Sequence, residues 1–317
     1  MRVYTSSEAV PVADRGCVVT IGNFDGVHLG HQVLLRAVAE RARELGAAAG
    51  VYTFHPHPRR VLYPEQSDRL IMTWEQLEFE LEQQQIEVLV REPFTLDFAA
   101  LDAETFLRNV IFDRIAPKEI FVGRDFHFGK GRSGGGETLA ELGPRLGIRV
   151  SILPQVRSGD IDVSSTRIRT AVARGGVEEA EQCLGRPYAI WGRVVEGERR
   201  GRVLGFPTAN LETENEILPE RGVYATSVRV FEGERPAGRV HPSVTNIGTR
   251  PTFDPGKLLT EAHLLDFDGD LYGARVELRF HARIRDEKRF SSPRELASQI
   301  ERDAAEARRI NASRGVR

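Results

Sequence analysis

The most informative stretch of this chain reads Val18-Val19-Thr20-Ile21-Gly22-Asn23-Phe24-Asp25-Gly26-Val27-His28-Leu29-Gly30-His31-Gln32. The β-branched run predicts a buried strand, and the glycines after it predict a turn that opens a helix. Such a turn directs free backbone N–H groups and the positive end of a helix dipole at one point. His28 and His31 are three residues apart around this turn, so both imidazoles are expected to face whatever binds there. The combination suits a polyphosphate.

A histidine pair at this spacing has two other interpretations, a metal site and an ordinary pair of solvated or buried side chains. Zinc takes four ligands, commonly with cysteine or carboxylate partners. The two cysteines, Cys17 and Cys183, are far apart in the sequence and form no paired motif. The glycines and the strand–helix setting therefore favour the phosphate interpretation.

The composition narrows the class of protein. A chain of 317 residues is long enough for two domains of ordinary size. Its 40% hydrophobic and 28% charged residues are typical of soluble globular proteins, and the formal net charge of −2 gives no reason to expect nucleic-acid binding. Two cysteines fit a reducing compartment, and the sequence has neither a secretory leader pattern nor an apolar run of transmembrane length. We expect a cytoplasmic protein without membrane partners.

The first half alternates strand-like and helix-like segments. Strands are predicted at residues 18–21, 50–54, 86–90, 119–122 and 148–153. Helices are predicted at 29–45, from a capping box at 73–76 to about 84, and around Val110, whereas the prolines of loop 54–60 are expected to forbid a helix there. This alternation predicts a doubly wound, Rossmann-like α/β domain with a parallel sheet, whose ligand lies at the carboxyl ends of the strands.

The pattern changes near Gly185-Arg186-Pro187-Tyr188. Short alternating runs follow at residues 189–194, 222–230, 240–247, 261–266 and 274–284. Their spacing predicts an antiparallel sheet or small barrel, and the segment 293–310 predicts a final helix. We therefore predict an α/β domain over residues 1–185 and an all-β domain over residues 186–317.

Two further elements of the first half suit ligand binding. Hydroxyl residues and arginines form Ser164-Ser165-Thr166-Arg167-Ile168-Arg169, which predicts an anion site at a helix start, or else an ordinary helix cap with solvated arginines. The glycine-rich stretch 123–136 follows a predicted strand. Its Phe126 and Phe128 are suited to stack on an aromatic ring and Asp125 to accept from ring N–H groups, unless the stretch is a flexible surface loop.

The second half carries an oxygen-donor pair and a carboxylate. Thr208 and Asn210 are two residues apart, so in extended geometry their side chains face the same way. They suit Mg²⁺ that arrives bound to nucleotide phosphates, the alternative being a proline-centred turn that enters a strand. Glu261 lies in an apolar run, where it suits a general base if it is partly buried near phosphates; otherwise it is an ordinary edge-strand glutamate.

Taken together, the first-half motifs resemble a known family. His28-Leu29-Gly30-His31 with Ser164–Arg169 is similar to the signatures of the nucleotidyltransferase superfamily. Gly22–His28, Tyr52–Phe54, Pro56–Arg59 and Phe128–Gly134 look like the adenylyltransferase half of the bifunctional bacterial riboflavin kinase/FAD synthetase family. The resemblance implies transfer of AMP from ATP to FMN, with Mg²⁺ assisting and with His28 and His31 stabilising charge on the phosphates.

The same resemblance implies the ligand contacts of this half. It places ATP at Gly22, Asn23, Phe24, Asp25, His28, His31, Ser164, Ser165, Thr166 and Arg169, and the flavin at Phe54, Pro56, Pro58, Asp125 and Phe128. His55 and His127 stand where the family more often has Asp and Arg.

The second half is similar to the riboflavin kinase domain of that family, a six-stranded antiparallel barrel with a C-terminal helix. The similarity rests on Gly205–Asn210, Gly222–Tyr224, Asn246–Phe253, Asp270–Gly273 and Ile284–Phe290. It implies that Gly201, Arg202, Thr208 and Asn210 hold MgATP, with Thr208 and Asn210 at the metal. It also implies that Glu261 takes the proton from the terminal ribityl hydroxyl, and that Arg285 and Phe290 lie near the flavin.

The resulting prediction is a two-step enzyme that converts riboflavin to FMN and FMN to FAD, with ATP used in each step. One alternative is that only one half is active and the other is a flavin-binding scaffold. The other alternative is a non-catalytic flavin carrier. The expected partners are small molecules, and self-association is left open.

Overall fold

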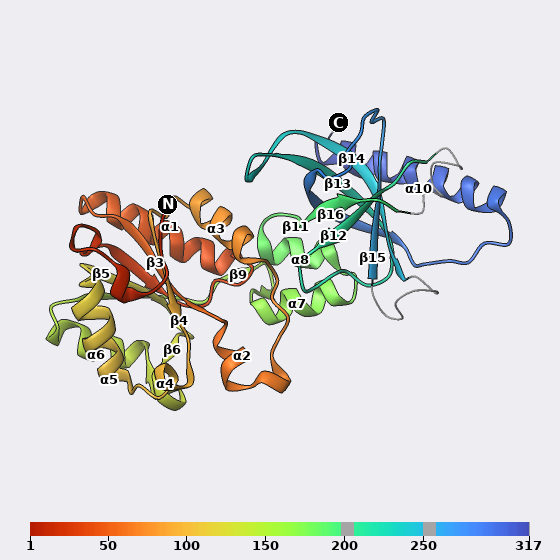
Figure 1. The fold of residues 1–317 in the computed structure, drawn as a ribbon. Helices are drawn as coiled ribbons and strands as arrows, with labels where there is room; N and C mark the ends of the chain where they lie inside the picture. Colours follow the sequence, from red (N-terminus) through yellow and green to blue (C-terminus); the bar gives the residue numbers. More distant parts are fainter. Residues whose placement is uncertain (198–205, 250–257, 317) are drawn as a thin grey trace. The chain divides into compact units, whose positions relative to one another are not determined.

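The computed structural model of the chain describes residues 1–197, 206–249 and 258–316 (Figure 1). They form two compact units. The first comprises Met1–Arg69 and Trp74–Ser164, and the second comprises Leu70–Thr73 and Ser165–Arg317. Among the described residues, no helix is both long enough and apolar enough to cross a bilayer.

A six-stranded parallel sheet forms the centre of the first unit, in the order β1-β4-β3-β2-β5-β8. Its strands are β1 (Arg2–Tyr4), β2 (Val18–Ile21), β3 (Ala49–His55), β4 (Val88–Pro93), β5 (Glu119–Gly123) and β8 (Arg149–Leu153). From β2 the order continues through β3 and β4 in one direction and through β5 and β8 in the other. The order in which successive strands are added to the sheet therefore reverses between β2 and β5.

Helices cover both faces of this sheet. The helices of this unit are α1 (Leu29–Glu44), α2 (Pro58–Leu62), α3 (Trp74–Gln83), α4 (Leu96–Ala99), α5 (Ala103–Thr105), the π-helix η4 (Phe106–Ile115) and α6 (Gly136–Arg145). Val19 and Ile21 of β2 share one core with η4 and α6. Helix α1, whose buried Leu35 and Val38 lie outside that core, contacts β2, β3 and β5. Every residue of β2 is buried, as expected for a central strand between two helical layers.

Short elements complete the first unit. They are the 3₁₀ turns η1 (Ser7–Ala9), η2 (Val12–Asp14), η3 (Pro64–Gln66) and η5 (Lys130–Arg132), and the two-stranded ribbons β6 (His127–Phe128) with β7 (Gly134–Gly135) and β9 (Arg157–Ser158) with β10 (Ile161–Asp162). The β6–β7 ribbon gives the glycine-rich stretch a regular structure that its composition did not indicate.

The second unit is a closed antiparallel barrel with the strand order β11-β12-β15-β14-β13-β16. The strands are β11 (Tyr188–Val195), β12 (Ala209–Thr213), β13 (Gly222–Glu232), β14 (Arg235–Thr249), β15 (Leu258–Leu264) and β16 (Arg275–Arg285), and the helices are α7 (Ser165–Ala173), α8 (Val177–Leu184) and α10 (Pro293–Ser313). Helix α10 packs Ala304 and Ala307 against Val223, Ala225 and Val244 of β13 and β14. Helix α8 contacts β11 and β16.

The structure confirms the predicted fold class, an α/β sheet unit followed by a six-stranded antiparallel barrel with a C-terminal helix. The prediction that prolines forbid a helix in loop 54–60 is wrong, because Pro58 begins α2. At the first position of a helix the fixed φ of proline is favourable and its missing N–H is not needed. The compact units divide between Ser164 and Ser165, and α7 and α8 group with the barrel. A division of catalytic domains after residue 185 remains a prediction.

Candidate functional site

In the first unit, the turn after β2 lies where the strand order reverses, between β2 and β5. β2 pairs with β5, so the turn that begins at Gly22 and the loop that begins at Gly123 leave the same edge of the sheet. In open α/β sheets the crevice at such a reversal is the usual ligand site. Strand order, which the sequence pattern does not give, is what selects this edge.

His28 caps α1 with its own side chain. Its Nδ1 accepts a hydrogen bond from the His31 backbone N–H at 3.2 Å. Because Nδ1 uses its lone pair in this bond, the neutral ring carries its proton on Nε2, which can donate to a phosphate oxygen. The two imidazole rings stack, with centroids 3.6 Å apart and planes 15° apart, and the buried Phe24 ring lies 5.1 Å from His31. The structure therefore brings both predicted histidines together at the start of α1.

Gly30 makes room for the His28 ring. A Cβ atom at position 30 would lie 3.1 Å from His28 Cε1 and 3.2 Å from Nδ1. The turn before it contains Val27 in the left-handed region, at φ 39°, and Gln32 Nε2 donates to the Val27 carbonyl at 2.9 Å. Gly22, Asn23, Phe24 and Asp25 belong to this turn; Asn23 is exposed, whereas Phe24 and Asp25 are buried.

The predicted Ser/Thr-Arg element spans the division between the two units. Ser164 ends the first unit, and Ser165 to Arg169 begin α7 in the second. Thr166 is exposed, and Ser165 and Arg169 are half-buried. Arg167 forms an ion pair with Glu179 of α8 at 2.8 Å, which secures the two helices to each other.

The residues predicted to contact flavin in the first unit differ in accessibility. Phe54 is half-buried and makes edge contacts with Tyr52 and Phe94, with ring centroids 5.5 and 5.6 Å apart. Phe128 is buried in the core shared with η4, and Phe126 stacks on it at 5.4 Å. Phe126 is thus the more accessible of the two rings. Pro56 and Asp125 are exposed, and Pro58 is half-buried at the start of α2.

The two departures from the family pattern take structural partners. The His55 ring makes an edge contact with the Trp74 ring, with centroids 5.4 Å apart, and burial and the charge of Arg91 lower its pKa. His127 Nδ1 lies 2.8 Å from the Asp125 carbonyl and 3.1 Å from Arg132 Nη2.

In the barrel, strand register aligns three polar side chains in one row. Asn210 of β12 lies directly opposite Glu261 of β15, and Glu261 lies directly opposite Asn246 of β14. Residues directly opposite one another in antiparallel strands point to the same face, with Cβ atoms roughly 4.5–5.5 Å apart. The same row continues through Val223 to Arg285 of β16. The predicted cation ligand Asn210 and the predicted base Glu261 thus share one face, whereas a bulge next to Val223 interrupts the register before Arg285.

Asn246 belongs to this row but was assigned no role from its sequence motif. Gly248, two residues further along β14, leaves open the space beside it. A Cβ atom there would lie 3.1 Å from Asn246 Nδ2 and 3.0 Å from Glu287 Oε1. The Asn246 amide and the Glu287 carboxylate therefore both lie beside Gly248, and Asn246 is the residue opposite Glu261. Only the pairing register, which joins β14 to β15, could have identified Asn246.

Asn210 has the properties of a cation ligand. Its side chain is buried, and its Oδ1 has no hydrogen-bond partner among the residues that the structure describes. The backbone of Gly197 covers its amide, because a Cβ there would lie 2.1 Å from Asn210 Nδ2. A buried amide oxygen without a partner among the described residues fits a hard cation that keeps other ligands from phosphate and water. Thr208 is half-buried, whereas the predicted Gly201 and Arg202 lie outside the described residues.

No group of three or more His, Cys, Asp or Glu residues suited to a metal ion occurs in the described part of the chain. The predicted ligands Thr208 and Asn210 are of other residue types, because a hydroxyl and an amide oxygen are uncharged donors.

Arg285 is occupied by a structural partner. Its guanidinium binds the buried Asp303 carboxylate of α10 through three hydrogen bonds of 2.7 to 3.1 Å. It also donates to the Asp286 carbonyl at 2.8 Å and lies 5.7 Å from the centroid of the Phe290 ring. This arrangement fixes Phe290, the other predicted flavin contact, beside the end of β16.

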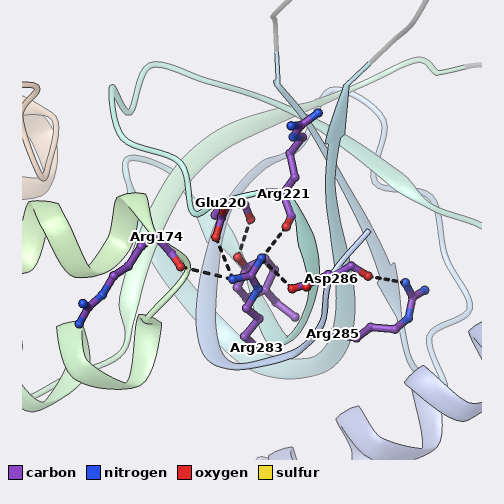
Figure 2. A network of polar contacts seen from close by, with 7 residues as sticks. Arg174, Glu220, Arg221, Arg283, Arg285 and Asp286 are labelled. Carbon is purple, nitrogen blue, oxygen red and sulfur yellow. Dashed lines mark hydrogen bonds and ion pairs between the residues drawn. The ribbon is translucent and has the colours of Figure 1, made fainter. Parts of the chain in front are cut away.

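The neighbouring Arg283 secures the same end of β16 to the α7–α8 turn. Figure 2 shows its guanidinium between the Glu220 carboxylate (2.9 Å), the Asp286 carboxylate (3.1 Å) and the backbone carbonyls of Arg174 (3.3 Å) and Arg221 (2.8 Å). Three chain segments, at Arg174, Glu220–Arg221 and Arg283–Asp286, thus meet at one side chain, and they hold the loop that starts at Asp286.

Both halves of the chain match known families. Residues 10–167 match the FAD synthetase family and residues 184–311 match the riboflavin kinase family. The bifunctional riboflavin kinase/FMN adenylyltransferase of Pseudomonas fluorescens is 39% identical over 94% of this chain and 94% of its own length. The enzyme of the same name from Bacillus subtilis is 38% identical over 92% of this chain and 91% of its own length.

A solved structure extends the likeness over both units. It is described as a macrolide-efflux protein from Streptococcus pneumoniae, is 31% identical and matches with a TM-score of 0.86 over 97% of this chain and 98% of that one. On the near-complete overlap with the curated relatives, the chain belongs to the family of bifunctional riboflavin kinase/FMN adenylyltransferases.

Proposed function

We propose that the chain makes FAD in two ATP-dependent steps: the barrel unit phosphorylates riboflavin to FMN, and the sheet unit transfers AMP to FMN and releases pyrophosphate. The family assignment supports both activities. The observation that carries the assignment of the first step is the row Asn210–Glu261–Asn246, in which Asn210 Oδ1 has no hydrogen-bond partner among the described residues. The row offers a carboxylate and a cation ligand on one face.

In the kinase step, Glu261 acts as the general base. Its carboxylate accepts the proton of the terminal ribityl hydroxyl while that oxygen forms a bond to the γ-phosphorus of ATP and the bond to ADP breaks. A base is needed because an alcohol is a poor nucleophile. Thr208 and Asn210 hold the nucleotide-bound Mg²⁺, which when bound neutralises phosphate charge. Because Thr208 and Asn210 are uncharged donors, the positive charge of Mg²⁺ would be balanced by the phosphates alone.

In the adenylyl-transfer step, the nucleophile is an FMN phosphate oxygen, which is already charged and needs no base. It attacks the α-phosphorus of ATP, and pyrophosphate leaves. The proposed work of the protein is to align the substrates and to stabilise charge, which His28, His31 and the N–H groups at the start of α1 are suited to do. Gly22–Asp25, Ser164–Thr166 and Arg169 are proposed as further ATP contacts.

The flavin contacts remain proposals with structural constraints. In the sheet unit, Phe54, Pro56, Pro58 and Asp125 have accessible surface, whereas Phe128 is covered by Phe126 and supports it from below. In the barrel, Phe290 is proposed as the direct contact. Arg285, whose guanidinium binds Asp303, is proposed to hold Phe290 in place.

Two alternatives would leave part of this proposal without a role: a single active half, or a carrier that binds flavin without ATP turnover. Incubation of the chain with riboflavin and MgATP, followed by separation of the flavins, distinguishes them. The proposal predicts FMN and then FAD. Accumulation of FMN without FAD would show that the sheet unit is inactive. Riboflavin that stays unchanged would support the flavin carrier.

We propose a cytoplasmic location, where the two cysteines would stay reduced. Cys17 and Cys183 are both free and buried, and burial raises the pKa of the Cys17 thiol to about 12. Such thiols are inert toward oxidation because they do not form thiolate at neutral pH. Self-association and the absence of nucleic-acid partners remain expectations from the sequence.

A further inference from the structure

His263 joins the strand that carries Glu261 to the segment that carries Thr208. It lies two residues after Glu261 on β15, so the two side chains share one face. Its Nδ1 lies 2.8 Å from the carbonyl oxygen of Pro207, the residue that precedes Thr208. A carbonyl can only accept, so Nδ1 is the protonated nitrogen and donates this hydrogen bond.

The bond lies where the backbone ladder between the two strands ends. Strand β12 starts at Ala209, which pairs with Ala262, and no pair is formed by Thr208 and His263. The His263 imidazole thus binds the Pro207 carbonyl just beyond the last backbone pair of the two strands. The Phe206 ring meets the His263 ring edge-on, with centroids 5.6 Å apart, and closes the same contact from the other side.

We propose that His263 is a positioning residue of the kinase site: it fixes the Pro207 carbonyl and thereby sets Thr208 beside Asn210 for the nucleotide-bound cation. The inference rests on the proposed role of Thr208 and Asn210 in the kinase step. It assigns His263 no proton transfer, because its Nδ1 proton is committed to the carbonyl.

The structure offers a matched set of substitutions for His263. Asn places an amide N–H where Nδ1 stands, whereas Gln extends its amide toward the position of Nε2, and Leu removes the donor. His241→Leu serves as the control, since His241 lies on β14 and its ring packs edge-on against Phe267, which is in the loop after β15. Thermal unfolding of each variant establishes that the barrel is folded.

The first measurement is calorimetric titration of the full chain with ADP, with and without Mg²⁺. Thr208→Val identifies the barrel binding step as the Mg²⁺-dependent step that it removes. We expect His263→Leu and His263→Gln to weaken that step at least tenfold, whereas His263→Asn and His241→Leu stay within threefold of the wild type. Equal Mg²⁺-dependent affinity in all four variants would overturn the proposal.

The second measurement is riboflavin phosphorylation at varied Mg²⁺. We expect His263→Leu to raise the Mg²⁺ concentration for half-maximal rate at least tenfold with kcat changed less than threefold, and His263→Asn to restore the wild-type value. A fall in kcat alone, with no change in Mg²⁺ dependence, would contradict a positioning role. Full kinase activity in Thr208→Val would instead show that Thr208 does not hold the cation. That result would contradict the proposed kinase site and not only the role of His263.

Discussion

Arg285 and Asp303 form a forked ion pair that ties the last residue of β16 to the middle of α10. The Asp303 side chain is 5% exposed and that of Arg285 is 21% exposed, so water screens the pair poorly. Gln299 Nε2 donates to the same carboxylate at 2.8 Å and completes its surroundings. The pair therefore links the barrel wall to the helix that covers it.

We expect Asp303→Ala to destabilise the barrel by about 3 kcal/mol, because it leaves a half-buried guanidinium without its counter-charge. Urea unfolding in a Trp74→Phe background measures this, since the buried Trp191 then reports on the barrel alone. The exposed Asp268→Ala is the control and should stay within about 0.5 kcal/mol of the parent. Equal midpoints for the two variants would show that the ion pair contributes nothing.

Gly30→Ala is expected to abolish most FMN adenylylation without loss of stability. The new Cβ would press on the His28 ring at about 3.1 Å, whereas alanine is favoured over glycine inside a helix by roughly 0.5–1 kcal/mol. Activity with FMN and MgATP should fall at least tenfold while the kinase rate is unchanged. The unchanged kinase rate of the same variant is the internal control, because both reactions are measured on one protein. Wild-type adenylylation by Gly30→Ala would show that the position of the His28 ring does not matter for this reaction.

Asn246→Asp is expected to move the acid limb of the kinase pH–rate profile to higher pH. The substitution places a second carboxylate opposite Glu261, and a like charge raises the pKa of its neighbour by about 1 unit or more. Asn109→Asp, at an exposed site in the other unit, should leave the profile unchanged. An unshifted acid limb in Asn246→Asp would mean that Glu261 is not the titrating base.

The sequence patterns predicted most of the regular structure because burial follows periodicity. β2, α1 and the barrel strands β11 and β16 lie within one or two residues of their predicted ranges. The π-helix η4 was predicted only as a helix, since its apolar residues do not specify the hydrogen-bond pattern. The β6–β7 ribbon was missed because glycine-rich sequence carries little periodicity, and helix α6 was not predicted although its Leu139 and Leu142 lie on one helical face.

The candidate sites were harder to complete, because they depend on strand order. Thr208, Asn210 and Glu261 were chosen from their chemistry, but only the register shows that Asn246 lies opposite Glu261. Likewise, the partner of Arg285 is Asp303, eighteen residues away on a helix, and no short motif links the two. Long-range pairing is a property of the fold and cannot be read from local spacing.

His281 is expected to make the barrel sensitive to acid. Burial, helped by the charges of Arg314 and Arg279, lowers the pKa of His281 to about 4, and its Nε2 lies 2.8 Å from Ser227 Oγ. Because the folded pKa is below that of the unfolded chain, stability is complete above pH 6.5 and declines as pH falls toward 4, by about 3 kcal/mol.

Urea unfolding at pH 7 and pH 4 in the Trp74→Phe background, with Trp191 as the reporter, checks this expectation. The carboxylates titrate over part of the same range, so the informative quantity is the difference between the wild type and His281→Gln. The variant should lose about 3 kcal/mol less than the wild type between the two pH values. Parallel losses in both proteins would exclude His281 as the source.

The most direct test of the two-site account measures both reactions in single-site variants of the full chain. Glu261→Gln should form FMN from riboflavin at a rate lower by about 10²-fold or more, yet convert added FMN to FAD at the wild-type rate. His28→Ala should accumulate FMN from riboflavin and make almost no FAD. Glu232→Gln, at the exposed end of β13, should keep both activities. Loss of both reactions in either single variant, or of neither in both, would contradict the assignment of one reaction to each unit.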